Sequence, residues 1–356
     1  MRAMLCLAAA VLAIVVARPA CAEIAQDIRR AQQETLESAP PAALAVADRL
    51  LARSGLTDDE RMLLHAMRAR AILRSGHDDP GDIRLAVAEE ATSDDRYAVR
   101  TAIANAWMAA GNLSDKRQNW ARSVFNYSQV IAYDCRCDTA YRKRADAYIA
   151  DDDVDAGIAD YRRAIAIAPG AAVNYRWLGL AYEMKLDFED AIAAYDKAVA
   201  RDPDDNNGYS LRGRALAVIG RYQTAQADLE KALALAPGCM PVLVWLHIVH
   251  LRTHVDDRDW LRTAWKPKAD AGWPGPALNY FVDAIDSPSL VHIALTSDGT
   301  KKMHQRCDGW FYLGEEAMAH GDTGAARALF RRTATNCNAV DYEWAPARVE
   351  LKRMAG

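Results

Sequence analysis

Small and large apolar residues recur through the middle of the chain with a period of 34 residues. Within each repeat they are spaced three or four residues apart, which places them on one face of a helix. A proline closes each repeat, at Pro169, Pro203 and Pro237. Proline lacks the amide hydrogen that a continuing helix needs, so each repeat ends there. The pattern predicts a pair of antiparallel helices in every repeat.

Other positions keep the same phase over three repeats. In the first helix they are Tyr141, Tyr175 and Tyr209, then Ala145, Gly179 and Gly213, then Ala147, Ala181 and Ala215; in the second they are Gly157, Ala191 and Ala225, then Tyr161, Tyr195 and Leu229, then Ala164, Ala198 and Ala232. We expect the small residues to lie where two helices cross and the large ones to fill the gaps around them. One such hairpin cannot bury its apolar face alone, so the hairpins must stack, which also creates a concave surface. The sequence therefore predicts an all-α solenoid of stacked antiparallel helix pairs.

A period of 34 residues is typical of tetratricopeptide repeats. The stretch WLGLAYEMKLDFEDAIAAYDKAVARDP, from Trp177 to Pro203, closely resembles the tetratricopeptide-repeat (TPR) family. The C-terminal part adds a more specific pattern, consisting of Trp273–Pro276, Cys307 followed by Phe311–Glu315, Ala328–Phe330, and Tyr342 before a closing helix. With this pattern, residues 138–352 resemble the bacterial lipoprotein NlpI-type TPR family.

That resemblance implies a periplasmic adaptor that brings envelope proteases or cell-wall hydrolases together by binding them in its concave groove. Members of the family are often dimeric, so a homodimer is among the expectations. The chain departs from the family because it lacks a good lipidation motif. A structural component of an envelope machine, such as a pilus or a secretion system, is the alternative from another class. A third reading is an enzyme that responds to redox state or metal through its cysteines or histidines.

The repeats divide the chain into segments. Residues 1–22 form a predicted signal peptide, 23–137 an N-terminal helical region with degenerate TPR-like hairpins, 138–237 three regular TPR units, 238–303 an irregular helical insert, and 304–356 a C-terminal TPR unit with a closing helix. Within the N-terminal region we expect helices over 42–53, 58–76, 81–92, 97–111 and 120–132.

The first residues have the composition of a secretory signal peptide. Arg2 precedes an apolar run from Ala3 to Ala17, which is too short to span a membrane comfortably, and Ala20–Ala22 offers an A-x-A cleavage site. Cleavage before Glu23 would send the protein to the periplasm. Lipidation of Cys21 is the competing reading, and it would anchor the protein to a membrane, as would an uncleaved signal.

Charge and motifs exclude several classes of function. The formal net charge is −4 and becomes −6 once the two arginines of the signal peptide are removed, whereas nucleic-acid binding needs a basic surface. The sequence has no H-E-x-x-H, G-x-S-x-G, Walker or dinucleotide-binding motif. We therefore expect a protein-binding module with no catalytic residues, no cofactor and no metal.

The first helix of each repeat presents one face to the concave surface. The candidate groove residues on this face are Arg142, Asp146, Arg176, Leu180, Glu183, Asn207 and Arg214. The three arginines could hold the carboxylates of an extended peptide through paired hydrogen bonds. A solvated face balanced by Asp146 and Glu183 is the alternative.

Five cysteines remain after cleavage, and the expected compartment allows disulfides. Cys307 begins the first helix of the C-terminal hairpin and Cys337 ends the second, so the antiparallel arrangement predicts a disulfide between them. Whether Cys135 and Cys137 form a bond stays open.

Three histidines also share one helical face. His247, His250 and His254 have the spacing i, i+3 and i+7, which leaves a zinc or copper site open beside the simpler reading of helix packing.

Overall fold

The computed structural model describes residues 40–53, 56–77, 81, 96–134, 136–268, 270, 272–296, 301–339 and 341–355, and every regular element among them is a helix. The all-α prediction is therefore confirmed. The predicted signal peptide and nearly all of the helix expected over 81–92 lie outside the described residues. None of the described helices combines the length and the apolar character needed to cross a membrane.

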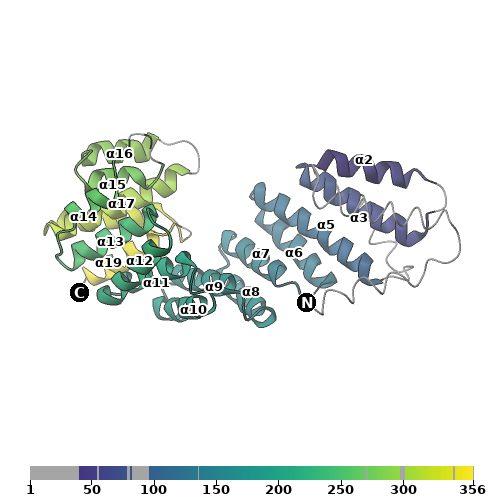
Figure 1. The fold of residues 1–356 in the computed structure, drawn as a ribbon, viewed down its shortest axis with the longest axis horizontal. Coiled ribbons are helices and arrows are strands. Elements are labelled where there is room, and N and C mark those ends of the chain that lie inside the picture. Colours follow the sequence, from purple (N-terminus) through teal and green to yellow (C-terminus); the bar gives the residue numbers. More distant parts are fainter. Residues whose placement is uncertain are drawn as a thin grey trace. The chain divides into compact units, whose positions relative to one another are not determined.

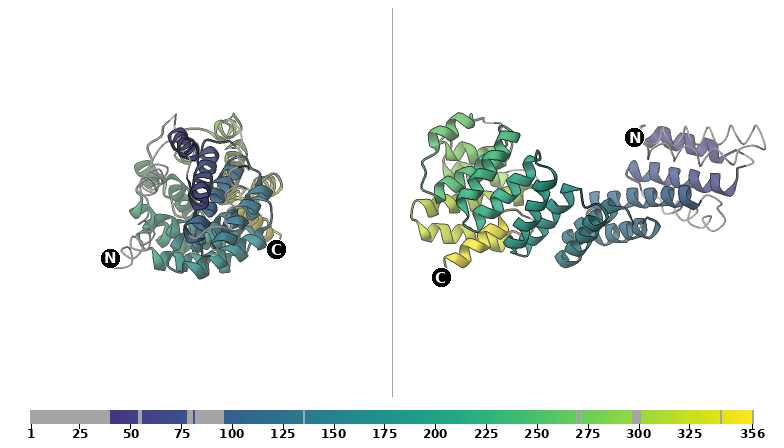
Figure 2. Two further views of the ribbon diagram at one scale, coloured as in Figure 1. Left: turned by 90° about the vertical axis from the view of Figure 1, so that its right-hand side faces the viewer. Right: turned by 60° about the horizontal axis from the view of Figure 1, so that its bottom comes forward.

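The chain divides into two compact units, Met1–Asp153 and Val154–Gly356. The boundary falls in the turn inside the first of the three predicted regular repeats. In unit 1 each helix packs against the next one described along the chain, and Figure 2 shows them in purple to blue. They are α2 (Pro40–Leu51), α3 (Asp58–Arg74), α5 (Arg96–Lys116), α6 (Trp120–Tyr133) and α7 (Asp138–Ala150).

Unit 2 begins with stacked hairpins and ends with a C-terminal group that packs back on them (Figure 1). Its helices are α8 (Val154–Ile167), α9 (Ala172–Met184), α10 (Phe188–Arg201), α11 (Asn206–Val218), α12 (Tyr222–Leu235), α13 (Met240–Arg252), α14 (Arg258–Ala264), α15 (Gly275–Phe281), α16 (Ser287–Thr296), α17 (Lys301–Ala319), α18 (Thr323–Asn336) and α19 (Trp344–Arg353). Helix α13 contacts both α15 and α17, which brings the C-terminal hairpin α17–α18 against the repeats.

One close approach recurs in the hairpins. A Cβ atom added to Gly179 would lie 2.7 Å from Cζ of Tyr195, a ring that has no exposed surface. The same clash would occur in three other hairpins, at Gly111 with Tyr127, Gly213 with Leu229 and Gly314 with Phe330. The glycine lets the two helix backbones approach until the large residue of the second helix fills the space. This is the role that the sequence pattern assigned to the small positions.

The tyrosine in this contact is also hydrogen-bonded. Tyr195 donates its hydroxyl proton to Glu183 Oε1 at 2.6 Å, and Tyr127 donates in the same way to Asp115 Oδ2 at 2.5 Å. Both acids lie four residues after the glycine of their hairpin. A buried phenol needs such an acceptor. In the hairpins that use leucine or phenylalanine instead, the corresponding residue is apolar: Ala217 and Met318.

The turn inside each hairpin contains a residue with positive φ. These residues are Gln118, Asp152, Leu186 and Gly220, which keep the 34-residue spacing, and the next in the series is His254 after α13. The repeat therefore continues through α13, inside the segment 238–303 that the sequence analysis treated as an irregular insert. What changes is the second helix of this repeat, since α14 has only seven residues.

His247 occupies the glycine position of this additional repeat. Its side chain is buried, its Nδ1 lies 2.9 Å from Asp257 Oδ1, and its Nε2 lies 3.1 Å from Glu316 Oε1. The ring of Phe281 from α15 lies 4.4 Å away. Because imidazole is too large for a close helix crossing, the space beside α13 is filled by α15 and α17 instead of a full second helix.

These contacts also answer the question of a histidine metal site. Asp257 bridges the first two histidines, since its Oδ2 lies 2.8 Å from His250 Nδ1. Both ring nitrogens of His247 already contact carboxylates, so neither is free to bind a metal. The third histidine, His254, is exposed in the turn. The face therefore serves helix packing, with a charged imidazole at its centre.

We predict that Gly179→Ala destabilises unit 2 by about 1–3 kcal/mol, because the added methyl group overlaps a ring that has nowhere to move. Chemical denaturation followed by circular dichroism measures this. Gly170→Ala is the matched control, because a methyl group added to Gly170 would meet no other atom within 4 Å. Equal stability of the two variants would show that the crossing tolerates a methyl group.

We also predict that stability falls between about pH 6.5 and pH 9. Burial alone would lower the pKa of His247, but the hydrogen bonds to Asp257 and Glu316 outweigh it and raise the pKa to about 9. A raised folded-state pKa stabilises the protein fully below the unfolded value and ceases to do so as pH rises through the folded value. The loss is on the order of 3 kcal/mol at 1.4 kcal/mol per pKa unit.

Thermal midpoints measured from pH 6 to pH 9.5 check this, with His247→Gln as the comparison. The variant should be less stable at pH 6.5 and should show a flatter profile. A wild-type midpoint that does not change over this range would mean that His247 is not charged in the folded protein.

Candidate functional site

A pocket of unit 2 has a volume of about 420 Å³ and opens on the face formed by the first helices of successive hairpins. Helices α9, α11, α13 and α17 supply most of its wall, and two loops supply the rest. The lining residues are Arg176, Trp177, Leu180, Asn207, Ser210, Leu211, Arg214, Pro241, Trp245, Trp273, Pro274, Asp308, Tyr312, Tyr342 and Glu343. We call it the C-terminal pocket.

The structure brings most of the predicted groove residues together in this pocket. Arg176, Leu180, Asn207 and Arg214 line it, and Glu183 is bonded to Arg214 in its wall. The other two, Arg142 and Asp146, lie half-buried on α7 in unit 1. The binding role of the seven residues stays a prediction.

Arg214 is the buried cation of the pocket. Its Nη2 donates to Glu183 Oε2 at 2.7 Å, and both side chains are almost fully buried. Burial opposes its charge, but the nearby carboxylates outweigh this and raise the pKa of Arg214. Its guanidinium carbon lies 4.7 Å from the ring centre of Tyr342, which is itself half exposed. Arg214 therefore contributes both a buried positive charge and part of the packed wall of the pocket.

Arg176 is also paired. Its Nε lies 3.1 Å from Asp205 Oδ2, a residue that caps the start of α11. Both arginines that the sequence placed in this part of the groove thus have protein carboxylates as partners. A ligand carboxylate would therefore compete with a protein carboxylate at each guanidinium.

Two carboxyl groups in the pocket wall, Asp308 and Glu343, interact with each other. Asp308 Oδ2 accepts a hydrogen bond from Trp273 Nε1 at 2.7 Å, and Glu343 Oε1 accepts one from the Tyr312 hydroxyl at 3.1 Å. Glu343 is only 3% exposed, and no donor in the described part of the chain reaches its Oε2 unless Asp308 carries a proton. Burial and the charge of Glu343 raise the pKa of Asp308 well above its usual range. Asp308 therefore holds its proton more tightly than an ordinary aspartate does.

Sequence reasoning did not identify Asp308 or Glu343 as site residues. Trp273 and Tyr342 entered only as parts of a family pattern. All four reach the pocket through contacts between segments far apart in the sequence. Arg252 Nε on α13 donates to Glu315 Oε2 on α17 at 2.6 Å, and its Nη2 lies 3.0 Å from Glu350 Oε2 on α19. These bonds hold the C-terminal group against the repeats.

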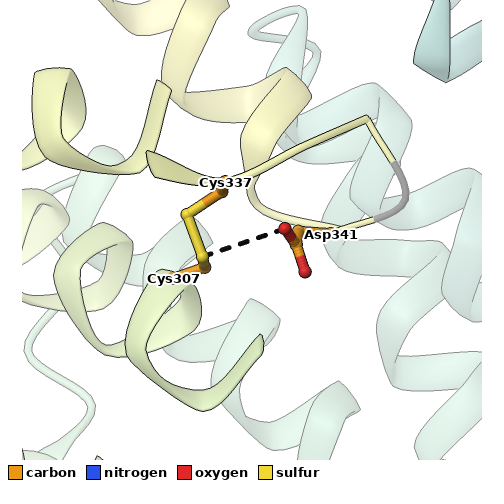
Figure 3. A group of neighbouring side chains, drawn as sticks. All are labelled: Cys307, Cys337 and Asp341. Atoms are coloured by element: carbon orange, nitrogen blue, oxygen red, sulfur yellow. Dashed lines mark hydrogen bonds between the residues drawn. A yellow bond between two sulfur atoms is a disulfide. The ribbon is translucent and has the colours of Figure 1, made fainter. Parts of the chain in front are cut away.

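A disulfide fixes the loop that carries Tyr342 and Glu343. Cys307 in the second turn of α17 and Cys337 at the end of α18 are bonded, with their Cα atoms 6.1 Å apart. Cys307 Sγ also lies 3.9 Å from Asp341 Oδ2, as Figure 3 shows. Asp341 is buried and accepts a hydrogen bond from the Asn338 backbone at 2.9 Å. The disulfide thus anchors the segment that leads directly into the pocket wall.

The other cysteines are not joined to this loop. Cys137 and Cys239 are free thiols, and burial raises the pKa of Cys137. Cys135 lies outside the described residues, so a bond between Cys135 and Cys137 remains open.

Unit 1 has a pocket of its own, of about 650 Å³, between α3, α5 and α7. Four basic residues line it, namely Arg70, Arg74, Lys116 and Lys143, together with one acid, Asp115. Burial and the neighbouring charge of Arg74 lower the pKa of Arg70. This pocket is therefore basic.

A family model described as tetratricopeptide repeat matches residues 108–172 and 175–239. The chain contains tetratricopeptide repeats. The matched residues include the second half of α5, all of α6 to α8, most of α9 and all of α10 to α12. Helices α9 and α11 line the C-terminal pocket. The finer likeness to NlpI-type proteins rests on the sequence pattern alone. A search of curated protein sequences finds no match.

Solved structures with similar folds are distant. The MamA protein is 18% identical and covers 45% of this chain and 89% of its own, with a TM-score of 0.41. PilW, described as a widely conserved type IV pilus biogenesis factor, is 17% identical and covers 71% and 99%, with a TM-score of 0.45. YrrB, described as a TPR protein with an unusual peptide-binding site, is 13% identical and covers 55% and 95%, with a TM-score of 0.41. At this level of similarity none of them bears on the function of this protein.

We predict that replacing both Cys307 and Cys337 with serine costs about 3–4 kcal/mol of stability, from the entropy of closing a loop of this length. The two cysteines are separated by 30 residues. Non-reducing peptide mapping of the wild type should yield a linked Cys307–Cys337 peptide. Cys239→Ser is the control, since that thiol is free and only half-buried. Separately alkylated Cys307 and Cys337 would contradict the disulfide.

Proposed function

We propose that this protein is an exported scaffold that binds a partner protein through an extended segment lodged in the C-terminal pocket. The role is non-catalytic in this proposal. Stacked helix pairs leave the side chains of their first helices on a shared concave face, and this face is where such repeats present binding surfaces.

The observation that carries the proposal is the pocket itself. It is concave, it has a mixed apolar and polar wall, and it is lined by first helices of consecutive hairpins. Two large aromatic side chains in its wall, Trp177 and Tyr342, are 38% and 53% exposed. Exposed aromatic residues in a concave site are typical of protein recognition.

The signal-peptide pattern supports a periplasmic location, and the resemblance to NlpI-type proteins supports an envelope protease or cell-wall hydrolase as the partner. The intramolecular disulfide is compatible with an oxidising compartment. The acidic net charge argues for a protein over a nucleic acid.

Affinity capture from a native envelope extract tests the proposal. The bait is the mature chain from Glu23, as wild type, as Ser210→Trp and as Ala227→Trp. Ser210 lines the pocket, so tryptophan there fills it, whereas Ala227 is exposed on α12 outside it. We expect a partner that is captured by the wild type and by Ala227→Trp but depleted about tenfold or more with Ser210→Trp, the effect of losing about 1.4 kcal/mol.

The identity of the captured protein separates the two classes of function. A protease or cell-wall hydrolase supports the adaptor, and a pilus or secretion subunit supports the envelope machine. Capture that is equal for all three baits would show that the pocket does not bind the partner.

A further inference from the structure

We propose that the C-terminal pocket binds a lysine or arginine side chain of the partner segment, with Asp308 and Glu343 as its acidic partners. This inference rests on the proposed function and gives it a chemical specificity. It follows from the charges of the pocket, from an acceptor that lacks a donor, and from the aromatic wall.

Each arginine of the pocket contacts a protein carboxylate, although Nε of both has no hydrogen-bond acceptor within the described residues. Arg176 is paired with Asp205 at 3.1 Å, and Arg214 with Glu183 at 2.7 Å. Arg214 is also covered by the Tyr342 ring at 4.7 Å. A ligand carboxylate would compete with a protein carboxylate at each arginine and would be repelled by Asp308 and Glu343. An acidic partner segment is therefore disfavoured.

Arg176 and Arg214 pair with Asp205 and Glu183, and neither Asp308 nor Glu343 forms an ion pair among the residues that the structure describes. Besides the pair formed by Asp308 and Glu343, Asp341 adds further negative charge near Asp308. Arg214 is the cation that acts on this region, and its direct hydrogen-bond partner is Glu183. Glu343 Oε2 is buried, and within the described residues it has no donor except a proton on Asp308. A cation placed beside such a buried carboxylate would stabilise its charged form.

The aromatic wall of the pocket suits both the aliphatic stem and the charged head of a lysine or arginine side chain. The rings of Trp273 and Tyr312 are stacked with their planes 12° apart, and Trp177 is exposed at the pocket. Aromatic faces attract ammonium and guanidinium groups, and the aliphatic stem of lysine or arginine packs on apolar surface. Asp308 is half-buried and still partly accessible, whereas Glu343 is buried. The cationic head would therefore meet Asp308, and Glu343 would strengthen the negative potential there.

Binding of such a cation lowers the raised pKa of Asp308. The charged and titratable groups around Asp308 are Glu343, Asp341 with its contact His304, Tyr312 and, beyond them, Arg214. With an ammonium or guanidinium group in place, the ionised form of Asp308 is favoured. Basic peptides should therefore release a proton on binding, and their affinity should increase as the pH rises through the raised pKa of Asp308.

A library of capped random decapeptides on an array, probed with the mature protein, tests the inference. We expect the selected peptides to share a lysine or arginine at one position. Replacing that residue with norleucine, or using the protein variant Asp308→Asn with Glu343→Gln, should weaken binding about tenfold to a hundredfold, the usual effect of losing a charge-assisted contact. Calorimetry in two buffers of different ionisation enthalpy measures the proton release, which Asp308→Asn should abolish.

The controls separate binding from folding. Asp155→Asn with Glu189→Gln makes the same two substitutions at exposed positions outside the pocket and should bind like the wild type. Asp308→Asn alone can still accept from Trp273 and can donate to Glu343, so its thermal midpoint should not fall. Selected peptides that lack a basic residue, or that bind the double pocket variant as tightly as the wild type, would overturn the inference and leave the proposed scaffold intact. Selection of no peptide at all would overturn both.

Discussion

The contact between Gly179 and Tyr195 is the constraint from which the binding surface of unit 2 is built. Because the glycine has no side chain, the two helices of the hairpin can approach until the Tyr195 ring is fully enclosed between them. The hydroxyl of this ring bonds Glu183, Glu183 bonds Arg214 of the next hairpin, and Arg214 lies under Tyr342 at the C-terminal end. A packing requirement inside one hairpin thus fixes a chain of polar contacts that ends at the pocket. A methyl group at position 179 would disturb the helix crossing and, with it, these polar contacts.

The regular repeats end where the close helix crossing at a glycine is lost. His247 stands where the glycine would be, so a full second helix cannot pack closely on α13. The imidazole is held by Asp257 and by Glu316 of α17, which draws the C-terminal hairpin onto the face that the missing helix would cover. The disulfide between Cys307 and Cys337 then fixes the loop of Tyr342 and Glu343. Histidine in place of glycine at position 247 therefore leaves a face of α13 on which the C-terminal hairpin packs. This hairpin carries the loop that completes the pocket wall.

The helix pairs were predictable from the sequence because they depend on local spacing. Glycine, tyrosine and proline recur every 34 residues, and such a period has few physical solutions. Cys307 and Cys337 were predictable as neighbours for the same reason, since a hairpin brings its two ends together. The additional repeat through α13 was missed because His247 stands at the position where the other repeats have a small residue. Asp308 and Glu343 were missed because they belong to no repeating position. They are brought to the pocket by contacts between distant helices, such as those of Arg252 with Glu315 and Glu350.

The charge of the groove shows why residue positions alone mislead. The aligned arginines suggested a surface for carboxylates, but Arg176 and Arg214 receive carboxylate partners from neighbouring hairpins, Asp205 and Glu183. Asp308 and Glu343, which form no ion pair within the described part of the chain, come from outside the regular repeats, from α17 and the loop before α19. In unit 1, where the same pairing of tyrosine and acid exists at Tyr127 and Asp115, the charged residues around the pocket are mostly basic. The repeat geometry fixes the shape of these surfaces, and the residues that the repeat does not constrain set their charge.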